Sequence, residues 1–428
     1  MRKSDSAGYE VVGSRFRKLL PLLKYVMHNQ HQIRWHWIST VFVALIFGGC
    51  KVDSDQNEFP LDPKITRSLF IEWRSPRFGH SNPQSMNNPV WEWLIQSKVS
   101  AYQANKRLNH GRDANGPGWC FSRFGQSSSE LPDGRVVLIA GEHEDYYDSD
   151  FYIYNDVVVQ HPDGRIEIFG YPRDVFPPTD SHSATVVGDQ IVLIGNIGYP
   201  DQRRSGVTQV MILNLKTFAM SRQETSGTPP GWISRHTATL AEDGSSIQIE
   251  RGNVSSGDKG RKWEENIDDW RLRLDDWSWE RLTDRQWPRW EVCRNDKEPL
   301  HLFAYQTEAW SKQSPALFGK LQPSDGESLE KQIGKKPDLD AFATLFKPPL
   351  QHEEVPATDE NKFGTHRIRI DGTIVRYVED SNCIQLTIEG ELPQSSLDIL
   401  SNDLQEKLCR MENVSCKLNP IIKASHER

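Results

Sequence analysis

Residues 180–195 read DSHSATVVGDQIVLIG, and this stretch decides the fold class. It begins with a run of small residues, turns at Gly188 and Asp189, and continues as a β-branched run that ends at Gly195. Glycine and aspartate tolerate the positive φ angles of a tight hairpin, and β-branched residues favour strands. The stretch therefore predicts two antiparallel strands joined by a tight turn.

The same arrangement occurs about 55 residues away on either side. Upstream, RFGQSSS at 123–129 leads through an Asp-Gly turn to VVLIAG at 136–141. Downstream, RHTATL at 235–240 leads through another Asp-Gly turn to IQIERG at 247–252. Small Ser, Thr and Ala side chains on the first strand suit a crowded central axis, and a period of this length is typical of solenoids and propellers.

The second half of each repeat predicts two further strands. These strands cover residues 152–159 and 165–169, 208–213 and 218–220, and 266–274 and 277–282. The last strand of each repeat carries an aromatic residue, such as Trp279, that suits packing against the next repeat. A four-stranded unit cannot bury its apolar face alone, so we expect the three units to stack.

These repeats resemble the kelch repeat, which is the blade of kelch propellers and of the galactose-oxidase central domain. The resemblance is carried by HSAT at 182–185, the strand that ends in LIG at 193–195, the spaced partner strand, and Trp279. It implies a mainly β chain with at least three four-stranded blades of a kelch-like β-propeller in residues 121–320. It does not imply one function, because propellers host unrelated activities.

The sequence departs from the kelch pattern at several positions. The usual double glycine is a single Gly141, Gly195 or Gly252, and two repeats lack the late Trp. The copper ligands and the cross-linked Tyr-Cys pair of galactose oxidase have no counterpart, so oxidase activity is not implied. The wider chain is similar to an uncharacterised bacterial kelch-like family whose members sometimes carry ankyrin repeats, but no ankyrin signature is present here.

Three blades do not close a ring, because propellers need four or more. We therefore expect residues 61–120 and 286–320 to supply irregular blades, caps or an oligomeric contact, with an extra strand at 299–305 (PLHLFAY). Residues 60–120 are predicted to form a helical N-terminal cap. Asn88 and Pro89 suit a helix start. Apolar side chains follow at helical spacing at Trp91, Ile95, Val99 and Tyr102.

Residues 362–428 predict a separate small α+β domain, which follows a helical and linker segment at 321–361. Strands are predicted at 367–370, 373–378 and 383–388, with a last strand at 414–418. Between the third and the last strand, a helix capped near Ser395 is expected to cover one face of the sheet. Its apolar stripe consists of Leu397, Leu400, Leu404, Leu408 and Met411.

Residues 1–59 have the features of an export segment. Basic residues precede an uncharged stretch at 37–49, and Cys50 follows it. This apolar run of about 13 residues is shorter than the roughly 20 residues of a membrane-spanning helix, so it predicts a signal segment. The FGGC sequence at 47–50 resembles the lipobox of a bacterial lipoprotein, with Cys50 as the lipidated residue and Met27 as an alternative start. The resemblance implies membrane association at the cell envelope. The alternatives are an uncleaved membrane anchor, a buried apolar strand, and a cytoplasmic protein.

The composition limits the classes of partner. The chain has 428 residues, of which 36% are hydrophobic and 26% charged, as in soluble globular proteins. The net charge is −8 and no long Lys/Arg run follows residue 40, so nucleic acid is excluded as the partner. Apart from Cys50, the five remaining cysteines form no CxxC motif and have no metal-ligand spacing. The sequence therefore predicts no zinc site, no full disulfide framework and no cofactor.

The strongest local cluster of charge is GEHEDYYDSD at 141–150, directly after the second strand of the first repeat. Its carboxylates and histidine are the kind of ligands that a hard cation such as Ca²⁺ takes, although their spacing is not that of an EF-hand. A solvated acidic loop is the favoured interpretation. The candidate ligands are Glu142, His143, Glu144, Asp145, Asp148 and Asp150.

His182 and His236 occupy nearly equivalent positions in two repeats. A hydrogen-bonded structural role is favoured over ligand binding or general-base catalysis, because the histidine belongs to the repeat pattern itself. The leading hypothesis is a binding or scaffolding protein, favoured over an enzyme because the sequence carries no catalytic motif, that offers its propeller loops to a protein or polymer ligand. The alternative is a metal-dependent enzyme with a site at the propeller mouth.

The lipoprotein hypothesis predicts the chemistry of the native N-terminus. Intact mass spectrometry of the protein isolated from its source membrane should give a chain that begins at a lipid-modified Cys50. A native chain that retains the residues before Cys50 would contradict this prediction.

Overall fold

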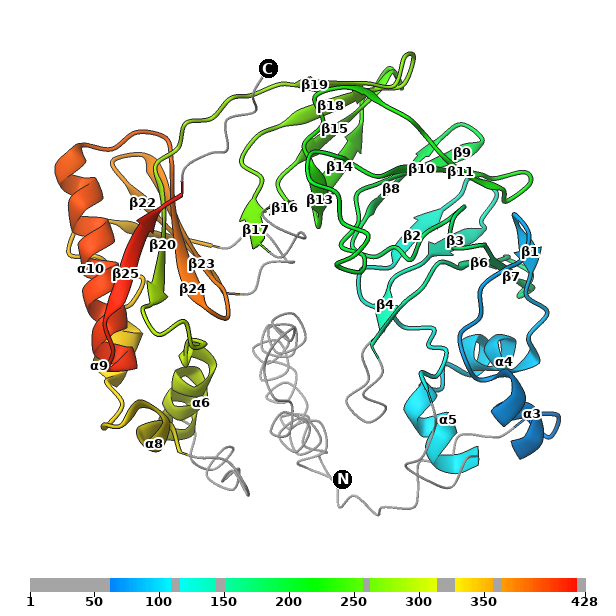
Figure 1. Ribbon diagram of the computed structural model, residues 1–428, viewed down its shortest axis with the longest axis horizontal. Helices are drawn as coiled ribbons and strands as arrows, with labels where there is room; N and C mark the ends of the chain where they lie inside the picture. Colours follow the sequence, from blue (N-terminus) through cyan, green and yellow to red (C-terminus); the bar gives the residue numbers. More distant parts are fainter. Residues whose placement is uncertain are drawn as a thin grey trace, which may run out of the picture. The chain divides into compact units, whose positions relative to one another are not determined.

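The computed structural model describes residues 62–108, 116–143, 151–256, 262–313, 328–356 and 364–421. It divides into two compact units, Asp53–Arg285 and Gln286–Arg428, which we call the N-terminal and C-terminal units and describe separately (Figure 1). The predicted signal segment, with Cys50 and Met27, lies outside the described residues. Within the described ranges, no helix is both long and apolar enough to cross a membrane.

The chain is mainly β, and the four strands predicted for each of the three repeats are present as consecutive antiparallel meanders (Figure 1). The first meander consists of β2 (Ser127–Glu130), β3 (Val136–Ile139), β6 (Val157–Gln160) and β7 (Ile166–Gly170). The second consists of β8 (Ser183–Val187), β9 (Gln190–Ile194), β10 (Val210–Asn214) and β11 (Met220–Arg222). The third consists of β14 (Thr237–Leu240), β15 (Ser246–Glu250), β18 (Trp270–Arg273) and β19 (Ser278–Arg281).

The first strands of the three meanders lie next to one another, with β8 between β2 and β14. Two short strands extend the sheets of the first and third meanders beyond their last strands. β1 (Gln84–Ser85) pairs with β7, and β12 (Ser226–Gly227) pairs in parallel with β19. A backbone ladder joins the meanders, because Ser181 donates to the Gly125 carbonyl and Arg235 donates to the Ser181 carbonyl, each at 2.8 Å. These three residues have positive φ angles, so one local conformation recurs in each repeat.

Apolar sheet faces form the core between neighbouring meanders. The interface between the first and second meanders buries side chains of both sheets, including Val137, Ile139, Ile191 and Leu193. The interface between the second and third meanders is built in the same way, and there Trp270 and Trp279 pack against Ile194 and Val210. Because adjacent residues of a strand point to opposite faces, the second meander contributes alternate residues to its two neighbours.

The outer face of the first meander is covered by helices α3 (Arg67–Trp73), α4 (Pro89–Ser97) and α5 (Ala101–Leu108). Helix α4 begins where the sequence indicates, because the Asn88 side chain accepts hydrogen bonds from the backbone of Val90 and Trp91. The fully buried rings of Trp91 and Trp119 stack 4.9 Å apart beneath it. The helices therefore bury the outer sheet face of the first meander.

The outer face of the third meander is polar instead. Along β14 and β18 the apolar residues alternate with polar ones, and the polar residues point away from the second meander. Arg271 and Glu280 form an ion pair across this outer face at 3.0 Å, with about half of each side chain exposed to solvent. The polar residues of this outer face include Thr237, Thr239, Gln248, Arg271 and Glu280. In the described residues, helices thus cover one end of the stack of meanders and polar side chains line the other.

The C-terminal unit has a six-stranded antiparallel sheet in the order β21-β22-β23-β24-β20-β25. Helix α10 (Gln394–Glu412) packs on one face of this sheet, and its buried residues include the whole predicted apolar stripe. The smaller helices α6 (Leu302–Gln313), α8 (Leu329–Ile333) and α9 (Leu339–Ala343) join the same apolar cluster. The strands are β21 (Glu353–Val355), β22 (Thr365–Ile370), β23 (Thr373–Glu379), β24 (Cys383–Glu389), β20 (Arg289–Arg294) and β25 (Cys416–Pro420).

Two expectations for residues 286–320 are wrong. In its described part, residues 286–313, the segment supplies no blade, because β20 lies between β24 and β25 in the C-terminal sheet. The strand expected at 299–305 is instead the start of α6, where Leu302 and Tyr305 are three residues apart and both buried in the same cluster. The pattern of a short apolar run fits a helix or a strand equally well. The elements against which the run packs therefore decide which of the two forms.

Replacing Gly125 with alanine should destabilise the protein more than the same change at Gly188. Both glycines have similar positive φ angles, +60° and +56°, which cost an alanine about 1–2 kcal/mol. A Cβ at Gly188 meets nothing within 4 Å, whereas a Cβ at Gly125 would lie 2.4 Å from the Ser181 nitrogen in the next meander. Urea unfolding should therefore give a loss of about 3 kcal/mol or more for Gly125→Ala, because strain and overpacking add. Equal losses at the two positions would contradict this.

Candidate functional site

The two ends of the N-terminal unit differ in their connections. One end has tight turns, such as the turn at Gly188 and Asp189. The other end has the long loops that join the second strand to the third strand of each meander. We call this end the loop face; its described residues are Phe124, 141–143, 151–156, 195–209, 251–256 and 262–269. Long loops on a rigid scaffold are a common place for binding residues.

The loops of the three meanders contact one another. Tyr199 of the second loop accepts a hydrogen bond from the Ile153 backbone at 3.0 Å, and its ring meets Phe151 edge-on with centroids 6.0 Å apart. In the same loop, Arg203 lies over the ring of Trp263 in the third loop, 5.0 Å from its centroid. These contacts join the three loops into one continuous surface.

Short strands add regular structure to the loop face. In the first loop, β4 (Glu142–His143) pairs with β5 (Tyr152–Ile153). In the third loop, β16 (Asn253–Ser256) and β17 (Lys262–Glu265) form a sheet with β13 (Trp232–Ser234). The Trp232 indole donates to the Ile197 carbonyl at 3.0 Å, which fixes the second loop to this sheet. The loop face is therefore largely preformed.

Buried polar groups hold the bases of the loops. Asp180, which is fully buried just before β8, accepts a hydrogen bond from the Gly198 backbone at 2.9 Å, and burial raises the pKa of its carboxyl group. Asp156 at the first loop receives the Arg123 guanidinium through two contacts of 2.5 and 3.0 Å. Arg123 also lies 3.5 Å from the centroid of the Tyr154 ring. These interactions fix the loops to the sheets.

The predicted acidic site is only partly described. Glu142 and His143 lie side by side on β4, where successive side chains point to opposite faces, so they do not converge on one ion. Burial, followed by the charge of Arg123, lowers the pKa of His143 to about 4. Glu144, Asp145, Asp148 and Asp150 lie outside the described residues. The Ca²⁺ site thus stays a prediction.

The two repeat histidines join neighbouring meanders. His182 Nε2 lies 2.8 Å from the Ser127 hydroxyl of β2, and His236 Nε2 lies 2.8 Å from the Ser183 hydroxyl of β8. Each histidine immediately precedes the first strand of its meander, so the two positions are equivalent, and Gln126 stands at this position in the first repeat. The favoured structural role agrees with these contacts, and general-base catalysis finds no support in them.

Burial keeps both of these histidines neutral. It lowers the pKa of His182 to about 4, and burial followed by the charge of His182 lowers the pKa of His236 to about 3. In the described part of the chain, the Nδ1 atoms of both rings are buried and have no hydrogen-bond partner. Burial disfavours the charged form of an imidazole, which explains the direction of the shifts.

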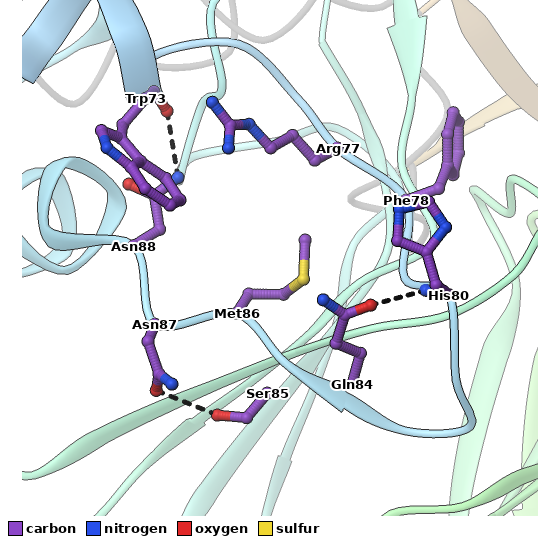
Figure 2. A pocket seen from close by; sticks show the side chains of 9 residues that line it. All are labelled: Trp73, Arg77, Phe78, His80, Gln84, Ser85, Met86, Asn87 and Asn88. Carbon is purple, nitrogen blue, oxygen red and sulfur yellow. Dashed lines mark hydrogen bonds between the residues drawn. The ribbon is translucent and has the colours of Figure 1, made fainter.

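A cavity of about 520 Å³ lies along the segment that leads to β1 (Figure 2). Trp73, Phe78 and Met86 supply its apolar lining, and most of its polar groups have partners within the chain. The guanidinium of Arg77 lies 4.3 Å from the Trp73 ring centroid, and the Gln84 side chain accepts from the His80 backbone at 2.6 Å. This cavity was not predicted from the sequence, because no motif marks its residues.

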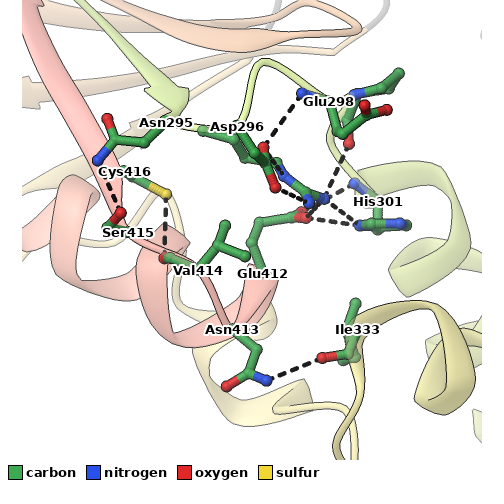
Figure 3. A network of polar contacts seen from close by, with 12 residues as sticks. Asn295, Asp296, Glu298, His301, Ile333, Glu412, Asn413, Val414, Ser415 and Cys416 are labelled. Carbon is green, nitrogen blue, oxygen red and sulfur yellow. Dashed lines mark hydrogen bonds and ion pairs between the residues drawn. The ribbon is translucent and has the colours of Figure 1, made fainter.

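The C-terminal unit contains a buried polar network (Figure 3). Glu412, whose side chain is fully buried at the end of α10, accepts from Arg294 at 2.9 Å. The same carboxylate accepts from the His301 backbone at 2.9 Å and lies 2.6 Å from His301 Nδ1. Arg294 lies at the end of β20 and His301 at the start of α6. The network therefore fixes the end of helix α10 to the sheet and to α6.

The C-terminal unit also contains a cluster that was not predicted from the sequence. Among the described residues, one group of at least three His, Cys, Asp or Glu side chains is close enough to share a metal ion, and it consists of Glu291, Cys293 and Cys383. The hydrogen bond between the two thiols, together with burial, raises the pKa of Cys383. No spacing rule reveals this cluster, because its cysteines meet only through the pairing of β20 with β24.

Comparisons with known proteins identify no family. No family model matches the chain, and no curated protein matches it. Among 74 solved chains that match, one is described as "Structure of YjhT". It has 8% sequence identity and a TM-score of 0.30, and the match covers 64% of this chain and 87% of that chain. A TM-score of 0.30 is too low to assign a fold.

Acidification should destabilise the N-terminal unit through its histidines. The folded pKa values of His182 and His236, about 4 and about 3, lie below the ordinary value of 6.5. Below pH 6.5 the unfolded chain therefore binds protons that the folded chain does not, and stability falls as the pH drops toward 4. Urea unfolding at about pH 7 and about pH 5 measures this loss.

The double variant His182→Gln/His236→Gln should lose part of this pH dependence, because glutamine does not titrate and already stands at the equivalent position as Gln126. His80→Gln, a change at an exposed histidine, serves as the control and should keep the full dependence. An unchanged slope in the double variant would show that the two buried histidines do not couple folding to pH.

Proposed function

We propose that this chain is a binding or scaffolding protein that presents the loop face to a protein or polymer ligand. In this proposal the three meanders are kelch-like propeller blades, and their role is to hold the loops rigidly. The observation that carries the proposal is the concentration of exposed large apolar side chains on the loop face. Of five such residues in the described ranges, three belong to it: Phe124, Phe151 and Val207, at 41%, 38% and 43% exposure.

The composition of the loop face supports a binding role. Tyr199 meets the exposed Phe151 edge-on, and Arg203 lies over the ring of Trp263 on the same loop face. Tyr, Trp, Phe and Arg are enriched in protein interfaces. Direct contacts hold these side chains in place, so little conformational entropy is lost when a partner binds. A preformed surface with exposed apolar side chains suits a protein segment better than a highly charged polymer.

The alternative, a metal-dependent enzyme at the propeller mouth, has less support. His182 and His236 are engaged with serines of the neighbouring meanders, and Asp180 is fully buried. A general base must reach its substrate within hydrogen-bond distance, which these positions do not favour. The enzyme hypothesis depends on the acidic residues between Glu144 and Asp150, and metal content lost in a His143→Ala/Asp145→Ala variant would revive it.

The proposed location is the cell envelope, with residues 1–59 as the membrane tether and Cys50 as the lipidated residue. The sequence of this segment is the support for the location. A tether fits a binding role, because it would hold the loop face near partners in the same envelope.

Removing the apolar side chains of the loop face should abolish ligand binding without unfolding the protein. We expect Phe151→Ser/Val207→Ser to lose the partners that the full-length chain retains after cross-linking in its source cells. Both side chains are more than a third exposed, so the loss of stability should be small. Circular dichroism and urea unfolding would verify the fold.

Ile71→Ser is the matched control, because Ile71 on α3 is a large apolar residue with 47% exposure outside the loop face. It should keep every partner. If the control and the double variant recovered the same partners, the loop face would be refuted as the binding surface. The same conclusion would follow if both variants lost the same partners.

A further inference from the structure

The second face of the C-terminal sheet, opposite α10, brings two cysteines together. In the sheet register, Cys293 of β20 stands directly opposite Cys383 of β24. The Ile388 backbone donates to the Pro288 carbonyl at 3.0 Å, so Pro288 and Ile388 form a hydrogen-bonded pair of the same ladder. Such pairs alternate along an antiparallel ladder, so Cys293 and Cys383, five positions further along, form a non-hydrogen-bonded pair, the kind whose side chains are closest.

Glu291 completes the cluster. It lies two residues before Cys293 on β20, so both side chains point to the same face of the sheet. One carboxylate oxygen of Glu291 and the two sulfur atoms all lie within 4.8 Å of one another. Cys383 is buried at 7% exposure, and the other two residues are partly buried. None of the five described cysteines is joined in a disulfide.

The donor atoms suit one class of ion. Two sulfurs and one carboxylate oxygen form a soft-to-borderline ligand set, which selects zinc over calcium or magnesium. Two sulfurs bound at about 2.3 Å to a tetrahedral zinc ion are about 3.8 Å apart, so side-chain shifts of about 1 Å or less would close the site. We propose that Glu291, Cys293 and Cys383 bind one zinc-class divalent cation.

Such an ion would join strands that are far apart in sequence. Glu291 and Cys293 belong to β20, the first strand of the C-terminal unit in chain order, whereas Cys383 belongs to the later β24. Three protein ligands leave a fourth position for water or another ligand. Bound metal should stabilise the C-terminal unit, because an ion that binds only the folded state shifts the folding equilibrium.

The other cysteine pair in this unit provides a contrast. The Cys416 backbone donates to Cys409 Sγ at 3.1 Å, so these two residues are also neighbours. The nearby Glu412 carboxylate is already engaged by Arg294 and His301. In the described residues, Cys409 and Cys416 belong to no group of three potential ligands. The proposed metal site therefore depends on Glu291 as well as on two adjacent thiols.

The test uses the full-length chain, reduced, stripped with a chelator and dialysed against zinc. We expect about one zinc ion per chain by elemental analysis and a higher thermal midpoint for the loaded protein. Cobalt in place of zinc should give the thiolate-to-cobalt charge-transfer absorption. Wild-type protein that takes up no zinc, or that binds cobalt without this absorption, would overturn the proposal.

Variants assign the metal to these residues. Cys293→Ser/Cys383→Ser should lose the ion and the midpoint shift, and Glu291→Gln should weaken zinc binding at least about tenfold. The control, Cys409→Ser, should bind zinc as the wild type does. Equal zinc content in the Cys293→Ser/Cys383→Ser protein and the control would refute the site. Native protein with a peptide cross-linked between Cys293 and Cys383 would assign the pair to a disulfide instead and would also overturn the proposal.

Discussion

The burial of apolar sheet faces between neighbouring meanders is the constraint on which the N-terminal unit depends. Each sheet is too thin to bury its own side chains, so Ile139 and Leu193 are removed from water only because two sheets meet. Fully burying one such side chain contributes about 1.5–3 kcal/mol, and each interface buries several. The contacts between loops on the loop face depend on this stacking, since the loops meet only where the sheets stand side by side.

The strands of the three repeats could be predicted because their signals are local. Small residues, a tight turn and a β-branched run lie within 16 residues at 180–195, and the structure has a hairpin there. The end of the stack was harder to predict, although the sequence contains the information. The run TATL at 237–240 alternates polar and apolar residues, which indicates a sheet with one solvated face rather than one between two blades.

Non-local pairing limits what the sequence alone can predict. Nothing near RWEVCR at 289–294 indicates that its partners are β24 and β25, so the segment was assigned to the wrong unit. The same pairing creates the cluster of Glu291, Cys293 and Cys383, which explains why spacing alone did not reveal it. His182 and His236 follow the repeat and could be found in the sequence, whereas Tyr199 and Arg203 of the loop face lie in an irregular loop without a period.

The position of β20 has a consequence for the order of folding. The ribosome makes β20 before any other strand of its sheet, yet its neighbours β24 and β25 end at residues 389 and 420. The strand must therefore wait, with both edges unpaired, until most of the C-terminal unit has been synthesised. The N-terminal meanders pair with their immediate successors and can assemble as they emerge. The two halves of the chain thus differ in how long they expose aggregation-prone edges during biosynthesis.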